Sequence, residues 1–214
     1  TGQPTVAVSS IAINPSNTNI MYIGTGEISS AYGRGQVGTP GARATYGMGI
    51  LKSTDGGSTW VVTGLVFTFP QLTAVQKVLL NPSNPNTIYA ITSEGTYKST
   101  NAGSTWSLIH NVLMGMDIVI NPSDTTILYA SYGQRNSTFG KGLYKTTNAG
   151  GSWTLLTALD TTNFGRTSLA LSPSNPQVLY AGVAHGGTSQ LRGLYRTTDA
   201  GASWSLQSTT NYVS

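Results

Sequence analysis

Side chains that could contact a ligand are concentrated in the glycine-rich stretches between apolar segments. They are Glu27, Tyr32, Arg34, Arg43 and Tyr46 in the longest such stretch, followed by Arg135, His185 and Arg192. Tyrosine rings can stack on sugars or peptides, while arginine and glutamate orient a ligand through hydrogen bonds. The sequence therefore predicts a sugar- or peptide-binding surface made of loops. Two alternatives stay open: charged side chains simply prefer loops, and the longest stretch could serve as a mobile flap or an assembly arm.

Most other site chemistries are not expected. The chain has no cysteine, and its two histidines, His110 and His185, lack the spacing and third partner of a metal site. Gly33-Arg34-Gly35 does not lie between a strand and a helix, so we predict no phosphate loop and no cofactor. The eleven lysines and arginines are scattered singly, which disfavours nucleic acid as a partner. No apolar run reaches the roughly 18 residues of a membrane span.

One eight-residue motif occurs four times and organises the chain. It has Asp or Asn at its third position and ends in tryptophan, over residues 53–60, 99–106, 146–153 and 197–204. A second motif, Asn/Ser-Pro-Ser-Asn/Asp, precedes each octet at residues 14–17, 81–84, 121–124 and 172–175, and an apolar-tyrosine pair follows it. Two motifs in fixed order, repeated about every 45 residues, indicate a repeat protein.

Each repeat predicts four short strands. An alternating apolar strand precedes the proline motif, a strand with the tyrosine follows it, a third strand leads into the octet, and the tryptophan opens the fourth. A four-stranded antiparallel unit of this length is typical of a propeller blade. We therefore expect an all-β fold, one β-propeller unit over residues 1–214 with blades at about 5–65, 72–110, 114–158 and 165–208.

The third strands share one further feature. Each carries a basic residue at the same position: Lys52, Lys98, Lys145 and Arg196. We expect these side chains to form a solvated edge that deters pairing between sheets. Both short turns of each blade should lie at one end of the strands and the variable connections, with the candidate ligand residues, at the other.

The octets resemble the Asp-box of the bacterial-neuraminidase-repeat families, which include sialidases, sortilin-type receptors and two-domain xyloglucanases. The resemblance covers nearly the whole chain and implies structural roles. Asp55, Asn101, Asn148 and Asp199 would bond nearby backbone, and Trp60, Trp106, Trp153 and Trp204 would pack between blades. Low charge, absence of cysteine and Ser/Thr/Asn/Gly-rich surfaces fit an extracellular or cell-surface bacterial protein.

Glycoside hydrolysis is the reaction that the resemblance suggests, and it needs two carboxyl groups. Once acids in octets, turns and strand starts are set aside, Glu27, Glu94 and Asp160 remain. The Phe/Tyr-Arg-Ile-Pro motif of sialidases is absent, and the segment nearest to the xyloglucanase acid motif, residues 51–57, is an ordinary octet. We therefore assign no catalytic residue.

Three functions stay open. The first is a non-catalytic extracellular or surface module that binds a glycan or protein or builds an assembly. The second is a fragment of a sialidase- or xyloglucanase-like glycoside hydrolase. The third is a structural subunit that assembles through its open blade edges. We expect half of a larger ring, cut from a longer chain or completed by a second copy, with a compact four-blade propeller as the alternative.

Overall fold

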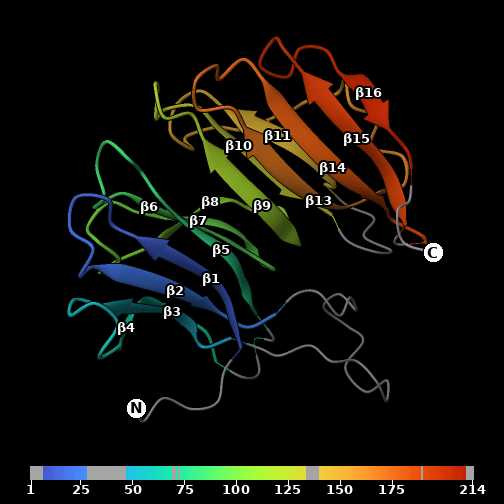
Figure 1. The fold of residues 1–214 in the computed structure, drawn as a ribbon. Coiled ribbons are helices and arrows are strands. Elements are labelled where there is room, and N and C mark those ends of the chain that lie inside the picture. Colours follow the sequence, from blue (N-terminus) through green and yellow to red (C-terminus); the bar gives the residue numbers. More distant parts are fainter. Residues whose placement is uncertain are drawn as a thin grey trace. The chain divides into compact units, whose positions relative to one another are not determined.

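The chain folds into two compact units, Thr1–Asn111 and Val112–Ser214. The computed structural model describes residues 7–27, 47–68, 71, 73–133, 140–188 and 190–210. Each unit contains two four-stranded antiparallel sheets, here called blades, whose strands neighbour one another in chain order (Figure 1). The four predicted four-stranded blades are therefore present.

Unit 1 contains blades 1 and 2. Blade 1 consists of β1 (Val8–Ile13), β2 (Met21–Thr25), β3 (Gly49–Ser53) and β4 (Val61–Val66). Blade 2 consists of β5 (Val75–Leu80), β6 (Ile88–Thr92), β7 (Gly95–Ser99) and β8 (Ser107–His110). Their first strands, β1 and β5, pack against each other.

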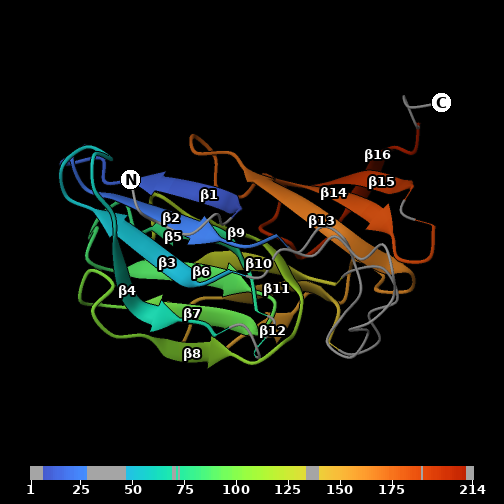
Figure 2. The same cartoon turned by 90° about the horizontal axis from the view of Figure 1, so that it is seen from below.

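Unit 2 contains blades 3 and 4. Blade 3 consists of β9 (Gly115–Ile120), β10 (Leu128–Tyr132), β11 (Gly142–Thr146) and β12 (Thr154–Leu155). Blade 4 consists of β13 (Phe164–Leu171), β14 (Leu179–His185), β15 (Leu191–Thr197) and β16 (Ser205–Ser208). β13 lies next to β9 and β10, as Figures 1 and 2 show.

The octets form tight turns held by their own acid or amide side chain. Oδ1 of Asp55 accepts hydrogen bonds from the Thr59 amide at 2.9 Å and the Ser53 hydroxyl at 2.8 Å. The next residue of each octet has a left-handed backbone, with φ of 72° at Gly56, 55° at Ala102, 55° at Ala149 and 57° at Ala200. Its amide donates to a carbonyl in the turn between the blade's first two strands, namely that of Asn19, Asn86, Thr126 or Gln177. Both short turns of each blade therefore lie at one end of the strands.

An apolar core fills the space between the two blades of each unit. In unit 1, Tyr22 and Ile50 of blade 1 pack with Val75, Val78 and Ile88 of blade 2. In unit 2, the corresponding cluster contains Tyr129 and Leu143 of blade 3 with Phe164, Leu169 and Leu179 of blade 4. Trp106 and Trp204, both partly buried, pack against these clusters.

A tyrosine and a lysine of one blade grip the octet of the next, an arrangement that we call the Tyr–Lys clamp. In unit 1, the Tyr22 hydroxyl at 3.2 Å and Lys52 Nζ at 3.3 Å both donate to the Ala102 carbonyl. In unit 2, the Tyr129 hydroxyl and Lys145 Nζ, each at 3.1 Å, donate to the Ala200 carbonyl. The octet of blade 2 or 4 is thereby tied to the blade before it.

The expectation that these lysines form a solvated edge is wrong for Lys52 and Lys145. Each lysine lies directly across the sheet from its tyrosine, so its Nζ sits 5.5 Å from the centre of that ring and reaches the next turn. Lys98 makes the same ring contact with Tyr89, and burial lowers the pKa of Lys98. The lysines belong to the packing of the blades.

Candidate functional site

The structure describes part of the predicted ligand surface. Glu27, His185 and Arg192 lie within the described residues, whereas Tyr32, Arg34, Arg43, Tyr46 and Arg135 lie outside them. The catalytic candidates Glu94 and Asp160 are also described. Candidate residues are therefore present on both units.

In unit 2, Arg192 and Asp160 form a two-point contact. One guanidinium nitrogen donates to the Asp160 carbonyl at 2.7 Å, and the other meets Asp160 Oδ2 at 2.7 Å. The guanidinium carbon also lies 6.0 Å from the centre of the Tyr195 ring. A hydrogen bond from the Thr162 amide is the main cause that lowers the pKa of Asp160, with Arg192 adding to it. Asp160 is therefore ionised at neutral pH, and Arg192 balances its charge.

The loops that carry these residues are tied together. The Gly186 amide donates to the Asn163 carbonyl at 2.8 Å, which joins the β14–β15 loop to the segment before β13. Nδ1 of His185 accepts hydrogen bonds from the Gly187 and Thr188 amides at 3.1 and 3.2 Å. An Nδ1 that accepts leaves the ring proton of neutral histidine on Nε2, as a donor. Asp160, His185 and Arg192 thus lie on loops of unit 2 that are joined by hydrogen bonds, and we call these three residues the unit 2 rim.

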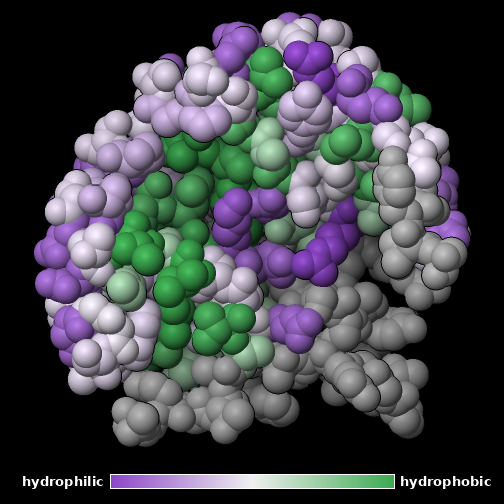
Figure 3. All heavy atoms as spheres, in the orientation of Figure 1, coloured by the Kyte–Doolittle hydropathy of each residue, from purple (hydrophilic) through white to green (hydrophobic). Residues whose placement is uncertain are grey.

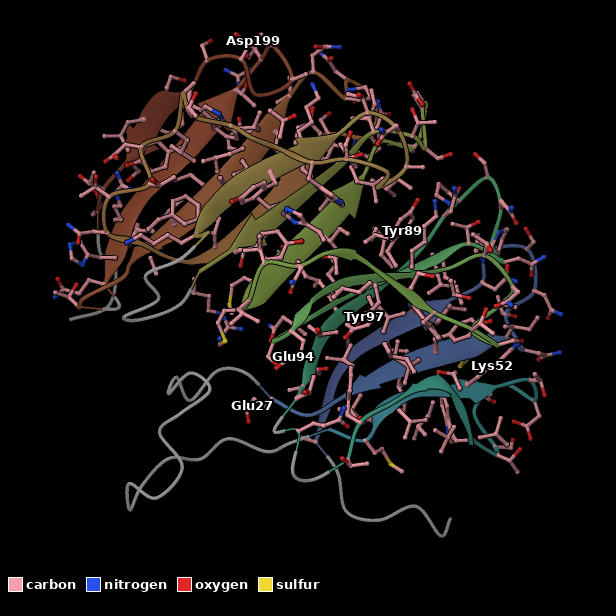
Figure 4. The ribbon with its side chains drawn as sticks, turned by 180° about the vertical axis from the view of Figure 1, so that it is seen from behind. Glu27, Lys52, Tyr89, Glu94, Tyr97 and Asp199 are labelled. Atoms are coloured by element: carbon pink, nitrogen blue, oxygen red, sulfur yellow. The ribbon has the colours of Figure 1, made fainter. Side chains whose placement is uncertain are left out.

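In unit 1, two carboxylates lie at the end of the strands opposite the octets. Figure 4 shows Glu27 and Glu94 toward one end of the unit and Lys52 toward the other. Glu94 sits in the β6–β7 hairpin, where its amide donates to the Thr92 hydroxyl at 3.0 Å and that hydroxyl donates to the Gly95 carbonyl at 2.9 Å. The turn is therefore rigid and holds Glu94 at its tip.

His110 ends β8 opposite Thr96 and is half-buried. Burial lowers the pKa of His110 to about 4, so this ring is neutral at pH 7. The described ranges contain no group of three or more His, Cys, Asp or Glu side chains placed to hold a metal ion. They also contain no helix of the length and hydropathy that crossing a bilayer requires.

Two features were missed by sequence reasoning, and they differ in whether the sequence carries a signal for them. The pairing of Asp160 with Arg192 joins residues 32 apart in the chain, and no motif connects them. The Tyr–Lys clamp, by contrast, left a signal, because its tyrosine and its basic residue recur once in every repeat.

Curated relatives of this chain are xyloglucanases. The xyloglucanase Xgh74A of Acetivibrio thermocellus is 28% identical over 204 residues, which cover 92% of this chain and 19% of the relative. A Paenibacillus xyloglucanase is 24% identical over 203 residues, covering 92% of this chain and 16% of the relative. This chain therefore spans less than one fifth of the length of these relatives. No family model matches the chain.

Solved structures with the same fold include GH74 enzymes. An ancestral GH74 enzyme superposes with a TM-score of 0.66 at 21% identity, over 94% of this chain and 24% of that one. The GH74 xyloglucanase of Xanthomonas campestris gives a TM-score of 0.62 at 18% identity, over 94% of this chain and 38% of that one. At these identities the likeness establishes the fold alone, and that fold is the predicted β-propeller architecture.

Proposed function

We propose that this chain is a non-catalytic extracellular module that binds a neutral glycan, of the class that xyloglucanases act on, at the unit 2 rim. The observation that carries the proposal is the Arg192–Asp160 pair. Its charges cancel, yet Asp160 remains exposed and keeps carboxylate lone pairs for sugar hydroxyls. Together with the partly exposed His185, the rim offers hydrogen-bond donors and acceptors around a charge-balanced pair, which suits an uncharged polyol.

The chemistry of Asp160 fits ligand binding and does not fit the general-acid role in glycoside hydrolysis. A glycosidase needs one carboxyl group that is protonated at the working pH, with a raised pKa. The pKa of Asp160 is lowered by the Thr162 amide and by Arg192, so this carboxylate accepts hydrogen bonds and does not donate a proton. The similarity to xyloglucanases supports the glycan class of the ligand.

Titration calorimetry with xyloglucan oligosaccharides tests the proposal. The Asp160→Asn variant loses the charge that holds Arg192, and we expect its affinity to fall at least about tenfold, as for a charge-assisted bond. Asp124→Asn is the matched control, because Asp124 also accepts the amide of the residue two positions on but lies at the opposite end of the strands. Equal affinities of the wild type and Asp160→Asn would contradict the assignment.

A glycoside hydrolase fragment is the second candidate, favoured by the position of Glu27 and Glu94 at the same end of unit 1. Release of reducing ends from xyloglucan measures this activity directly. Glu27→Gln and Glu94→Gln should each abolish it if these residues are the acid and base. Undiminished activity in both variants would remove them from that role.

A further inference from the structure

We propose that blade 4 of one copy of this chain docks on blade 1 of a second copy, and that Tyr180 and Arg196 clamp the Gly56 carbonyl there. This contact would repeat, between copies, the blade interface that each unit already contains. It concerns a surface separate from the unit 2 rim and goes beyond the proposed glycan binding.

Blade 4 carries the same pair of a tyrosine and a basic residue, and no carbonyl among the described residues accepts a hydrogen bond from it. Arg196 lies directly across the sheet from Tyr180, with its guanidinium carbon 5.9 Å from the ring centre, as Lys52 and Lys145 lie over their tyrosines. Tyr180 is 37% exposed, whereas Tyr22 and Tyr129, which each hold a carbonyl, are 1% exposed. Nε of Arg196 is buried and has no hydrogen-bond partner among the described residues. The donor half of a clamp is thus present, and none of the described residues supplies its acceptor.

Blade 4 also carries an exposed side chain at the position of a second contact between blades, in which a side chain accepts an amide of the next blade. In unit 1 the Ser10 hydroxyl accepts the Val78 amide of the next blade at 2.9 Å, and in unit 2 Asp117 Oδ2 accepts the Leu169 amide at 2.8 Å. Ser168 holds the same position in β13 of blade 4, two residues along the strand from Ala170, and both are exposed. Blade 4 therefore carries the amide acceptor as well as the clamp.

Blade 1 presents the complementary half. Gly56 occupies the octet position of Ala102 and Ala200 and shares their left-handed backbone, so its carbonyl is available in the same type of turn. The octet of blade 1 contains Asp55, just as the octet gripped by Lys145 contains Asp199, so a cation at this point meets an acidic turn.

The apolar side chains on this face of blade 1 are exposed. Ile11 and Ile13 of β1 match Val78 and Leu80 of β5 in register; they are 59% and 46% exposed, whereas their counterparts are 3% and 8% exposed. Figure 3 shows hydrophobic side chains gathered over this part of unit 1. In blade 2 the equivalent side chains are buried against blade 1. Blade 1 therefore offers the apolar and hydrogen-bonding groups that a preceding blade would cover.

The two free halves differ, so the contact is heterologous, and each docked pair of copies still has one half of each kind exposed. This property gives a decisive test by sedimentation velocity over a concentration series. Ala170→Arg places a charge on the blade 4 face, and Ile11→Arg places one on the blade 1 face. Both positions are exposed, so each variant should fold as the wild type does, which circular dichroism checks.

We expect the wild-type mass to rise above 22.4 kDa with concentration and each variant to stay monomeric. An equimolar mixture of the two variants should form a species of two chains and none larger, because one intact half remains on each. Tyr180→Phe should weaken wild-type association about fivefold, the equivalent of about 1 kcal/mol. Leu206→Ser is the control and should not change the association. Leu206 is 52% exposed and pairs with Tyr195, on the face of blade 4 opposite to Tyr180 and Arg196.

Three results would overturn the proposal. A wild-type chain that stays monomeric at every concentration would assign these faces to a different chain. Association that survives Ala170→Arg or Ile11→Arg would place the contact elsewhere. A mixture of the two variants that fails to pair would show that the two faces do not meet.

Discussion

The Tyr–Lys clamp of unit 2 should contribute measurably to stability, and its two donors should not act independently. Tyr129→Phe keeps the buried ring and removes one hydrogen bond to the Ala200 carbonyl, which should cost about 1 kcal/mol of unfolding free energy. Lys145→Met keeps the stem and removes the second donor with its ring contact, again about 1 kcal/mol. Each single variant leaves the carbonyl with one partner.

The double variant leaves that part-buried carbonyl with neither donor, which adds about 1 kcal/mol for an unsatisfied acceptor. We therefore expect a loss of about 3 kcal/mol, compared with about 2 kcal/mol if the two effects were additive. Urea unfolding of the single and double variants, followed by tryptophan fluorescence, measures this coupling. The expected shift is large enough to resolve, because a domain of this size has only about 5–15 kcal/mol in total.

Tyr180→Phe is the matched control at low protein concentration, where copies are separate. Its hydroxyl grips no carbonyl among the described residues, so the free energy of unfolding should change by less than about 0.5 kcal/mol. An equal loss in Tyr180→Phe and Tyr129→Phe would refute the clamp as the cause. Strict additivity in the double variant would refute the shared acceptor.

Three further outcomes follow from particular residues. Phe164→Ala should cost about 3–5 kcal/mol in urea unfolding, because the ring is fully buried in the unit 2 cluster, while Leu206→Ala should have little effect. Gly95→Ala should cost about 2 kcal/mol or more and lower the melting temperature, because φ is 131° there and a β-carbon would overlap the His110 carbonyl. Burial lowers the pKa of His110 from 6.5 to about 4. Between these two pH values the unfolded chain binds a proton that the folded chain does not, so the free energy of unfolding falls as the pH drops from 6.5 to 4. Because the ring is half-exposed, we expect a loss of about 1–2 kcal/mol over this window. In His110→Gln the free energy of unfolding should depend less on pH across that window. If its slope against pH is the same as in the wild type, other groups cause the dependence.

The sequence predicts part of the candidate site. The sequence places Arg192 and His185 in variable connections and leaves Asp160 as one of three acids outside the repeated motifs. Their arrangement was not predictable. Whether an arginine in a loop is solvated or holds a carboxylate depends on which loops meet, and that is set by the packing of β13 to β15.

The sequence by itself determined the strands, the turns and the number of blades. These depend on local chemistry, since alternating apolar residues, proline and the Asp/Asn-x-Gly octets specify backbone conformation over a few residues, and repetition copies it four times. Only the tertiary structure decided the role of the basic residues. Tyr22 and Ala102 are 80 residues apart in the chain. Lys52 donates to the Ala102 carbonyl, and is not part of a solvated edge, because packing brings the turn of the next blade to its amine. Contacts of that range depend on how whole sheets face one another, which no local pattern specifies.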